Sequence, residues 1–463
     1  MGKLIAAVYK EQHLQGSLPT VALEEQVQAI EETCALNQKI EDVFENADTA
    51  HAMTKALEDL AFVVDNIREV TPKEAALIQI AGDMSVAGAN VPAEHVTPSM
   101  ESILDGKITA REIAAKIKDT VEHIIAAIRA LLRKVSTYVQ SYISRATVVA
   151  GGSETRLKKL EEAYRNIHGT SPTRKSFEMV LPTVGGRATN TMDELLDSSK
   201  DFLHALDAFT RVAGDANYNF GSGFVALYET NLGKNEESDQ ATRHTAVLSA
   251  MKRISRSFDV GHAFHRYRDL TGDDGTVITD TPSLIGGVKI TVSSMPESVF
   301  DSSTLHSSVS IRELLGKVAR KNGINVQLEE GATTAKVEVE AMTDSQIRKA
   351  IELTKQLLTH YSGRSGSTSL TSAMKKRNDF ARQCSDTIMN RVKEMNQEIP
   401  LAYSLSVEAL GVTEAITRNS TIAYSRLSEN TGRLISYLLT AISKSIRAHA
   451  EDEEKLESEK EKK

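Results

Sequence analysis

Apolar residues recur at three- and four-residue steps along most of the chain, which predicts amphipathic helices. The first two cover about residues 21–70, with a break near 45–49, and Thr71 before Pro72 opens another. The segment 88–99, GANVPAEHVTPS, has the proline and small residues of a linker. We therefore expect an N-terminal helical region over residues 1–95.

The strongest helical pattern begins where Thr109 and Glu112 form a capping box. Its middle, IIAAIRALL at 124–132, is nearly as apolar as a membrane segment but contains an arginine. The apolar run is far shorter than the roughly 18 residues that cross a bilayer, and the polar face carries both signs of charge. Packing in a helical bundle is the preferred interpretation, with membrane or phosphate contact as alternatives. The expected apolar stripe is Ile113, Ile117, Val121, Ile124, Ile128, Leu131, Val135 and Tyr138.

This pattern fades near 148–154, VVAGGSE, where we expect a linker before a second, charged helix. The two helices would form a region over residues 96–170. The next segment, 171–190, mixes Pro, Gly and Thr with a short apolar run and predicts a loop or an edge strand. A capping box at Thr191 and Glu194 then opens a helix that ends near 214, and another helix is expected over 237–258.

The clearest β pattern follows. Residues 286–294, GGVKITVSS, alternate with β-branched side chains, and 324–341, INVQLEEGATTAKVEVEA, read as two strands around a Glu-Gly turn. Helices are expected over 309–321 and over 343–361, the second opened by Thr343 and Gln346. This predicts a small α+β unit of strand, helix, hairpin and helix within a middle region, 171–365.

After a flexible joint at 362–369, SGRSGSTS, long helices are predicted over 370–396 and 404–450, within a C-terminal helical region, 366–450. The last residues, 451–463, are a mixed charge run that we interpret as a solvated or frayed tail. The predicted fold class is mainly α, with long amphipathic helices in bundles and a small inserted α+β unit.

No motif nominates a catalytic, cofactor or metal site. His262 and His265 have a metal-ligand spacing but no evident third ligand. The segment 269–280 departs from a calcium loop and better fits a tight turn at Asp274 and Gly275 that leads into a strand. We therefore expect no cofactor, no metal and no enzymatic activity. The alternative is an enzyme with its site within 176–361, where strands and irregular loops occur.

Charge narrows the choice of partners. With 55 Lys and Arg against 63 Asp and Glu, the net charge of −8 gives no global attraction to DNA or anionic lipid. Contact with DNA would need a local patch, such as Lys375, Lys376 and Arg377 or the basic end of the long helix. Tryptophan is absent and Cys34 and Cys384 lie far apart, so we expect neither base-stacking platforms nor a disulfide framework.

The segment 99–166 begins SMESILDGKITAREIAAKIKDTVEHIIAAIRALLRKV and continues to LKKLEEAYRN. It resembles a stretch in the internal head, or inner-body, proteins of giant tailed bacteriophages. In that family a helix containing Ser-x-Glu leads to an amphipathic helix of the form KI…I…AI.AL..KV, and a charged helix follows. The chain departs from the family in lacking the tryptophan that such helices often carry near their ends.

The resemblance implies a structural protein inside the capsid of the virion. Such proteins are made in the host cytoplasm, packaged with the genome beside other head proteins, and in some cases ejected with the DNA. For this chain, weak contact with the packaged DNA through a local basic face is a further expectation. A prohead protease trims them after glutamate in small-x-Glu sequences. An α-helical membrane-active protein that inserts residues 124–132 is the alternative from another class. Because the polar face carries both signs of charge, a membrane partner is not expected.

Candidate processing positions follow from that implied specificity. Because a protease needs an extended and exposed chain, glutamates in the predicted linkers are favoured. Glu101 and Glu154 are therefore the preferred sites, with Glu24 and Glu178 as weaker ones. The remaining matches, Glu58 and Glu408, fall in or beside predicted helices.

Overall fold

The computed structural model describes residues 110–165, 175–210, 268–300 without 273 and 274, 321–329, 334–362, 369–394 and 400–461, with scattered residues in 32–81, 248–256 and 313–318. Helices make up 73% of the interpretable residues, and the described strands form two small antiparallel sheets. The predicted class, mainly α with a small α+β insertion, is therefore confirmed. The division into five regions stays a prediction.

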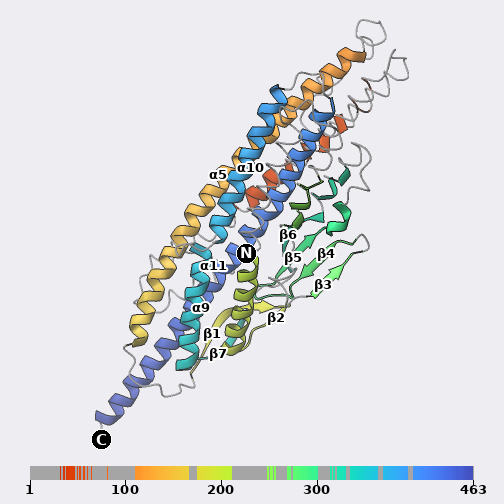
Figure 1. Ribbon diagram of the computed structural model, residues 1–463. Helices are drawn as coiled ribbons and strands as arrows, with labels where there is room; N and C mark the ends of the chain where they lie inside the picture. The colour runs from red at the N-terminus through yellow and green to blue at the C-terminus, as the bar shows by residue number, and fades with distance from the viewer. Residues whose placement is uncertain are drawn as a thin grey trace.

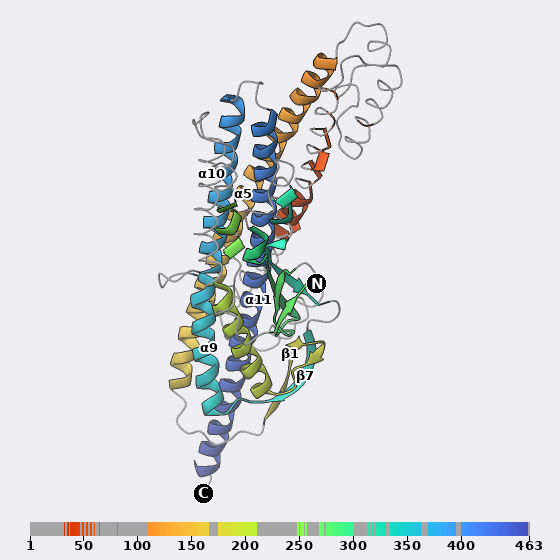
Figure 2. The same cartoon turned by 45° about the vertical axis from the view of Figure 1, so that its right-hand side comes forward.

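Four helices build an elongated bundle, with both sheets on one side of it (Figures 1 and 2). They are α5 (Ala110–Arg165), α9 (Asp344–Ser362), α10 (Leu370–Glu394) and α11 (Pro400–Glu461). The two longest, α5 and α11, have 56 and 62 residues. At 1.5 Å of rise per residue they are roughly 80 to 90 Å long, so they determine the length of the molecule.

The bundle buries the predicted apolar faces. On α5, Ile124 and Val135 are buried, and Leu131 and Tyr138 are half-buried, while the other four side chains of the predicted stripe lie outside the described residues. On α11, the apolar residues Leu427, Leu434, Leu438 and Ile442 recur at seven- and four-residue steps and are all buried. Helix packing is thus confirmed for the segment that looked most like a membrane helix.

The predicted linker at 148–154 is wrong, because α5 continues through Gly151 and Gly152 to Arg165. Glycine in a helix interior lowers helix stability by about 1 kcal/mol relative to alanine. The two adjacent glycines therefore made the sequence read as a break in the helix. Val149, Ala150 and Leu157 on both sides of the glycines are buried in the bundle. This packing keeps the segment helical.

The prediction of a frayed tail is also wrong, because α11 continues to Glu461 and projects beyond the other helices (Figure 1). The charged residues of 451–461 are good helix formers, and Glu451 and Lys455 have the i,i+4 spacing that supports a helix. An apolar stripe is therefore not needed for the helix to continue once the bundle has nucleated it.

One sheet has the order β2-β1-β7, with β1 (Ser176–Val184), β2 (Arg187–Ala188) and β7 (Thr334–Glu340). The other has the order β3-β4-β5-β6, with β3 (Arg268–Thr271), β4 (Val277–Asp280), β5 (Val288–Ser294) and β6 (Gly323–Leu328). A short 3-10 helix, η2 (Glu297–Phe300), follows β5. The strand over 286–294 and the tight turn before β4, where Gly275 has φ +78°, are confirmed.

Two strand predictions need correction. The two strands of 324–341 do not form a hairpin, since β6 pairs with β5 and β7 pairs with β1 in the other sheet. The segment of 171–190 predicted as a loop or an edge strand forms β1, which lies in the middle of its sheet. In both cases the partner strand lies far away in the sequence, and local alternation carries no information about it.

Both predicted capping boxes of the middle region are confirmed. Thr191 Oγ1 accepts from the Glu194 amide at 3.1 Å, and Glu194 accepts from the Asn190 amide at 2.7 Å. Thr343 and Gln346 exchange bonds of 3.3 and 2.8 Å in the same reciprocal manner at the start of α9. The described residues of the expected helices at 192–210, 248–256 and 313–318 are helical.

Candidate functional site

Helix α11 holds both sheets against the bundle. Ser445 Oγ accepts from the Met342 amide at 2.9 Å, and His449 Nε2 lies 2.8 Å from the Met342 carbonyl oxygen, just after β7. Beside the other sheet, Asn430 Nδ2 donates to the Ile285 carbonyl at 3.0 Å. These three polar contacts, each from a different turn of α11, fix the middle region along the helix.

Gly286, in the turn before β5, lies against Asn430 of α11. Its φ is +82°, and a Cβ atom there would lie 2.2 Å from Asn430 Oδ1. Both facts exclude a larger side chain, since L-residues avoid this conformation and the asparagine would have to move. The glycine pair of the sequence GGVKITVSS is thus needed for sheet docking.

A buried contact joins α5 to α11 at the middle of the bundle. The Tyr142 hydroxyl donates to the Ser425 carbonyl at 3.2 Å, and both residues are buried. Arg145 lies three residues further along α5, and Arg426 follows Ser425 on α11. Two arginines from different helices are therefore brought to the same level of the bundle.

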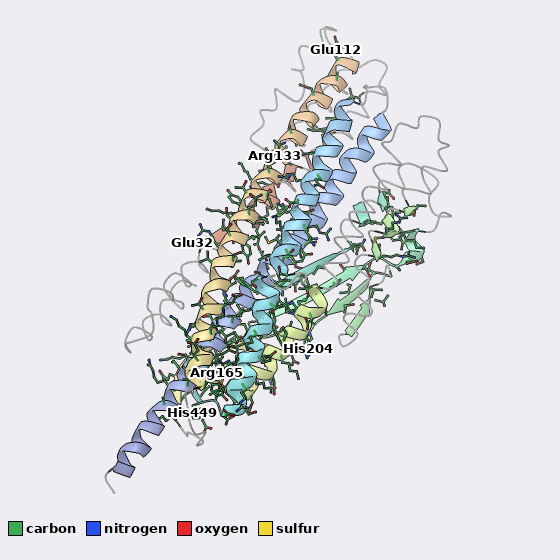
Figure 3. All side chains as sticks on the ribbon, turned by 60° about the vertical axis from the view of Figure 1, so that its left-hand side comes forward. Glu32, Glu112, Arg133, Arg165, His204 and His449 are labelled. Atoms are coloured by element: carbon green, nitrogen blue, oxygen red, sulfur yellow. The ribbon has the colours of Figure 1, made fainter. Side chains whose placement is uncertain are left out.

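Acidic residues of the N-terminal region pair with these arginines. Glu41 accepts from Arg426 Nη2 at 2.9 Å and from Nε at 3.1 Å, while Arg426 Nη1 donates to the Val326 carbonyl of β6 at 2.8 Å. Glu32 pairs with Arg145 against the middle of α5 (Figure 3). We call Arg145, Arg418 and Arg426 the arginine face.

The third arginine of the face, Arg418, is half-buried, and burial lowers its pKa while the charge of Glu45 opposes that effect. Apolar packing accompanies the two ion pairs and the charge of Glu45. Leu36, Ile40 and Phe44, on the same N-terminal helix as the glutamates, are buried in the core. The N-terminal region thus covers the bundle through both charge and apolar area.

Sequence reasoning missed this arrangement, because no local motif links Glu32, Glu41 and Glu45 to arginines about a hundred or more positions away. The available signal was the excess of Asp and Glu in the N-terminal helices. Such an excess indicates that a basic partner exists somewhere but cannot say which of the 55 Lys and Arg residues provide it.

The structure changes the ranking of the candidate processing positions. Glu154 was favoured as a linker residue, but it lies half-buried within the continuous helix α5. Glu178 is exposed, yet it lies in β1, where its backbone pairs with β7 and its carboxylate with Lys336 at 2.6 Å. Neither residue has the extended, unpaired backbone that cleavage requires. Glu101 and Glu24 lie outside the described residues.

The three residues of the predicted basic patch on α10 do not lie on one face of the helix. Lys375 and Lys376 are exposed, but Arg377 is only 1% exposed and points into the bundle, so its predicted contact with DNA is wrong. The i to i+1 step turns a side chain by 100° around a helix, which places consecutive basic residues on different faces. On α5, the exposed Arg133 lies 3.7 Å from Asp386 of α10.

Polar contacts also join the C-terminal end of α5 to α9. The Tyr164 hydroxyl donates to Asp344 of α9 and accepts from Arg348 Nε at 2.8 Å, and the pKa of Tyr164 is raised, mainly by burial. Lys355 of α9 pairs with Glu161 at 2.6 Å. Burial lowers the pKa of Arg156 to about 10, so this arginine stays charged at neutral pH. These groups join helices rather than converge on a substrate.

The described residues contain no group of three or more His, Cys, Asp and Glu that could hold a metal ion. His262 and His265 lie outside them. None of the described helices is long and apolar enough to cross a membrane.

A protein-family model of the phiKZ-like phage internal head proteins matches residues 21–448. The chain belongs to this family. The match covers the acidic N-terminal helices, the long α5, both sheets and α11 as far as Ala448. It therefore confirms the resemblance that rested on residues 99–166 alone. No curated protein and no solved structure matches the chain.

Membership of this family makes the protein a structural component of the interior of the phage head. The polar contacts between elements are consistent with that role, because they connect α5, α9, α11 and the sheets to one another.

Proposed function

We propose that this internal head protein is a non-enzymatic rod that is packaged with the genome and contacts other head proteins inside the capsid. The observation that carries the proposal is the family match over residues 21–448. The architecture supports it, since α5 and α11 of 56 and 62 residues give an extended body with a large lateral surface. The protein is made in the host cytoplasm, enters the assembling head and is a candidate for ejection with the DNA.

We propose further that a prohead protease cuts the chain after Glu101. This position lies between the N-terminal helices, which include Ile40 and Phe44, and the start of α5 at Ala110. A cut there would separate the N-terminal region from the bundle without breaking any described helix. A cut after Glu154 would require α5 to unfold, and one after Glu178 would require β1 to leave its sheet.

Peptide mapping of purified mature particles tests the cut. Trypsin should yield a semi-tryptic peptide of residues 102–107, SILDGK, in place of the fully tryptic peptide 74–107. The peptide 146–156, which spans Glu154, should remain intact and provides an internal control. An intact 74–107 peptide in mature particles at the same abundance as the control peptide would refute processing after Glu101.

A further inference from the structure

Charge is distributed very unevenly between the two sides of Glu101. Residues 1–101 contain 6 Lys and Arg against 17 Asp and Glu, a net charge of −11. Residues 102–463 contain 49 Lys and Arg against 46 Asp and Glu, a net charge of +3. The whole chain, at −8, therefore owes its acidity entirely to the N-terminal region.

Two of the N-terminal acids form ion pairs with the bundle. Glu32 pairs with Arg145 and Glu41 with Arg426, while Glu45 acts on Arg418 through its charge. Tyr142 and Ser425 hold α5 and α11 together beside Arg145 and Arg426, so these two arginines are positioned by the bundle itself. The basic side of the contact would thus remain in place if the acidic side left.

We propose that the acidic residues described in 32–46 cover the arginine face, and that removal of residues 1–101 uncovers a site for the phosphate backbone of DNA. The inference rests on the proposed cut after Glu101. Arginine suits this ligand, because its planar guanidinium donates paired hydrogen bonds to phosphate oxygens. The cover keeps the new chain from binding nucleic acid until the cut changes its net charge from −8 to +3.

Two observations favour phosphate over an acidic protein as the ligand. The arginines are spread over two long parallel helices, and Arg418 and Arg426 are eight residues apart on α11, about 12 Å along the helix axis. Such a row fits a regularly charged polymer better than a single carboxylate. Packaged DNA would also be the most concentrated polyanion around an internal head protein, which makes a few contacts per chain sufficient.

The test uses the full chain with the recognition sequence of a site-specific protease placed at residue 101. The chain is folded, cut and passed through gel filtration, and its binding to a labelled DNA duplex is measured over a range of salt concentrations. We expect the uncut chain to bind weakly and the cut chain to bind at least tenfold more tightly at low salt. Three arginine-phosphate contacts should give log K against log salt a slope of roughly −2.7.

The variant R145Q/R418Q/R426Q, cut in the same way, should lose this gain. Its matched control is R165Q/R187Q/R253Q, which removes three charges from exposed arginines outside the face and should keep most of the gain. If the triple variant does not fold, the single variant R426Q replaces it and should reduce the slope by about 0.9. Adding the released fragment back should restore weak binding.

Several results would overturn the proposal. The fragment could stay bound through gel filtration, the cut chain could bind DNA no better than the uncut chain, or both triple variants could lose the gain equally. If the cut chain dimerised and did not bind DNA, the arginine face would be a binding site for a second copy of the chain instead. Because the cut is made in vitro, these outcomes are independent of whether particles contain the chain processed at Glu101.

Discussion

At the scale of single residues, the arrangement of the elements depends on side chains that join distant parts of the chain. Tyr142 joins α5 to α11, Asn430 joins α11 to the turn at Ile285, and Glu41 joins the N-terminal region to Arg426. Each pair is separated by more than a hundred positions in the sequence. Single substitutions at such contacts should therefore weaken docking between elements rather than the elements themselves.

Gly286→Ala should lower the free energy of unfolding by about 2 to 3 kcal/mol. About 1 to 2 kcal/mol comes from the positive φ, and about 1 kcal/mol comes from the lost bond between Asn430 and Ile285. Urea unfolding measures the change. Gly186→Ala is the control, because Gly186 also has a positive φ, +73°, but its Cβ would have no neighbour within 4 Å. Equal losses for the two variants would show that Asn430 is not the constraint.

At the scale of elements, the sequence predicted helices well and strand partners poorly. Capping boxes at Thr191 and Thr343 and the apolar stripe of α11 are local signals, and the structure confirms them. The partners of β6 and β7 are determined by burial against β5 and β1, which alternation within 324–341 could not show. The ion pairs of Glu32 with Arg145 and of Glu41 with Arg426 could not be predicted from local sequence either, because the partners lie far apart in the chain.

The continuity of α5 can be tested at Gly151. Its φ is in the ordinary range, and a Cβ atom there would meet nothing within 4 Å, so Gly151→Ala should raise the free energy of unfolding by about 0.5 to 1 kcal/mol. Thermal unfolding followed by circular dichroism measures this. A loss of stability would instead indicate the linker with a break at 148–154 that the sequence pattern suggested.

At the scale of the whole molecule, a long bundle with two sheets on one side and an acidic N-terminal region defines a rod that suits dense packing. Family membership places it inside the phage head. The proposed cut after Glu101 would change the net charge of the rod inside the head without altering the helical bundle.

Protease protection in intact particles tests the internal location most directly. Purified virions are treated with an external protease before and after the heads are opened, and tryptic peptides of α5 and α11 are quantified by mass spectrometry. We expect these peptides to survive treatment of intact virions in full and to be lost once the heads are opened. Digestion of the chain in intact virions, or its absence from them, would contradict an internal location.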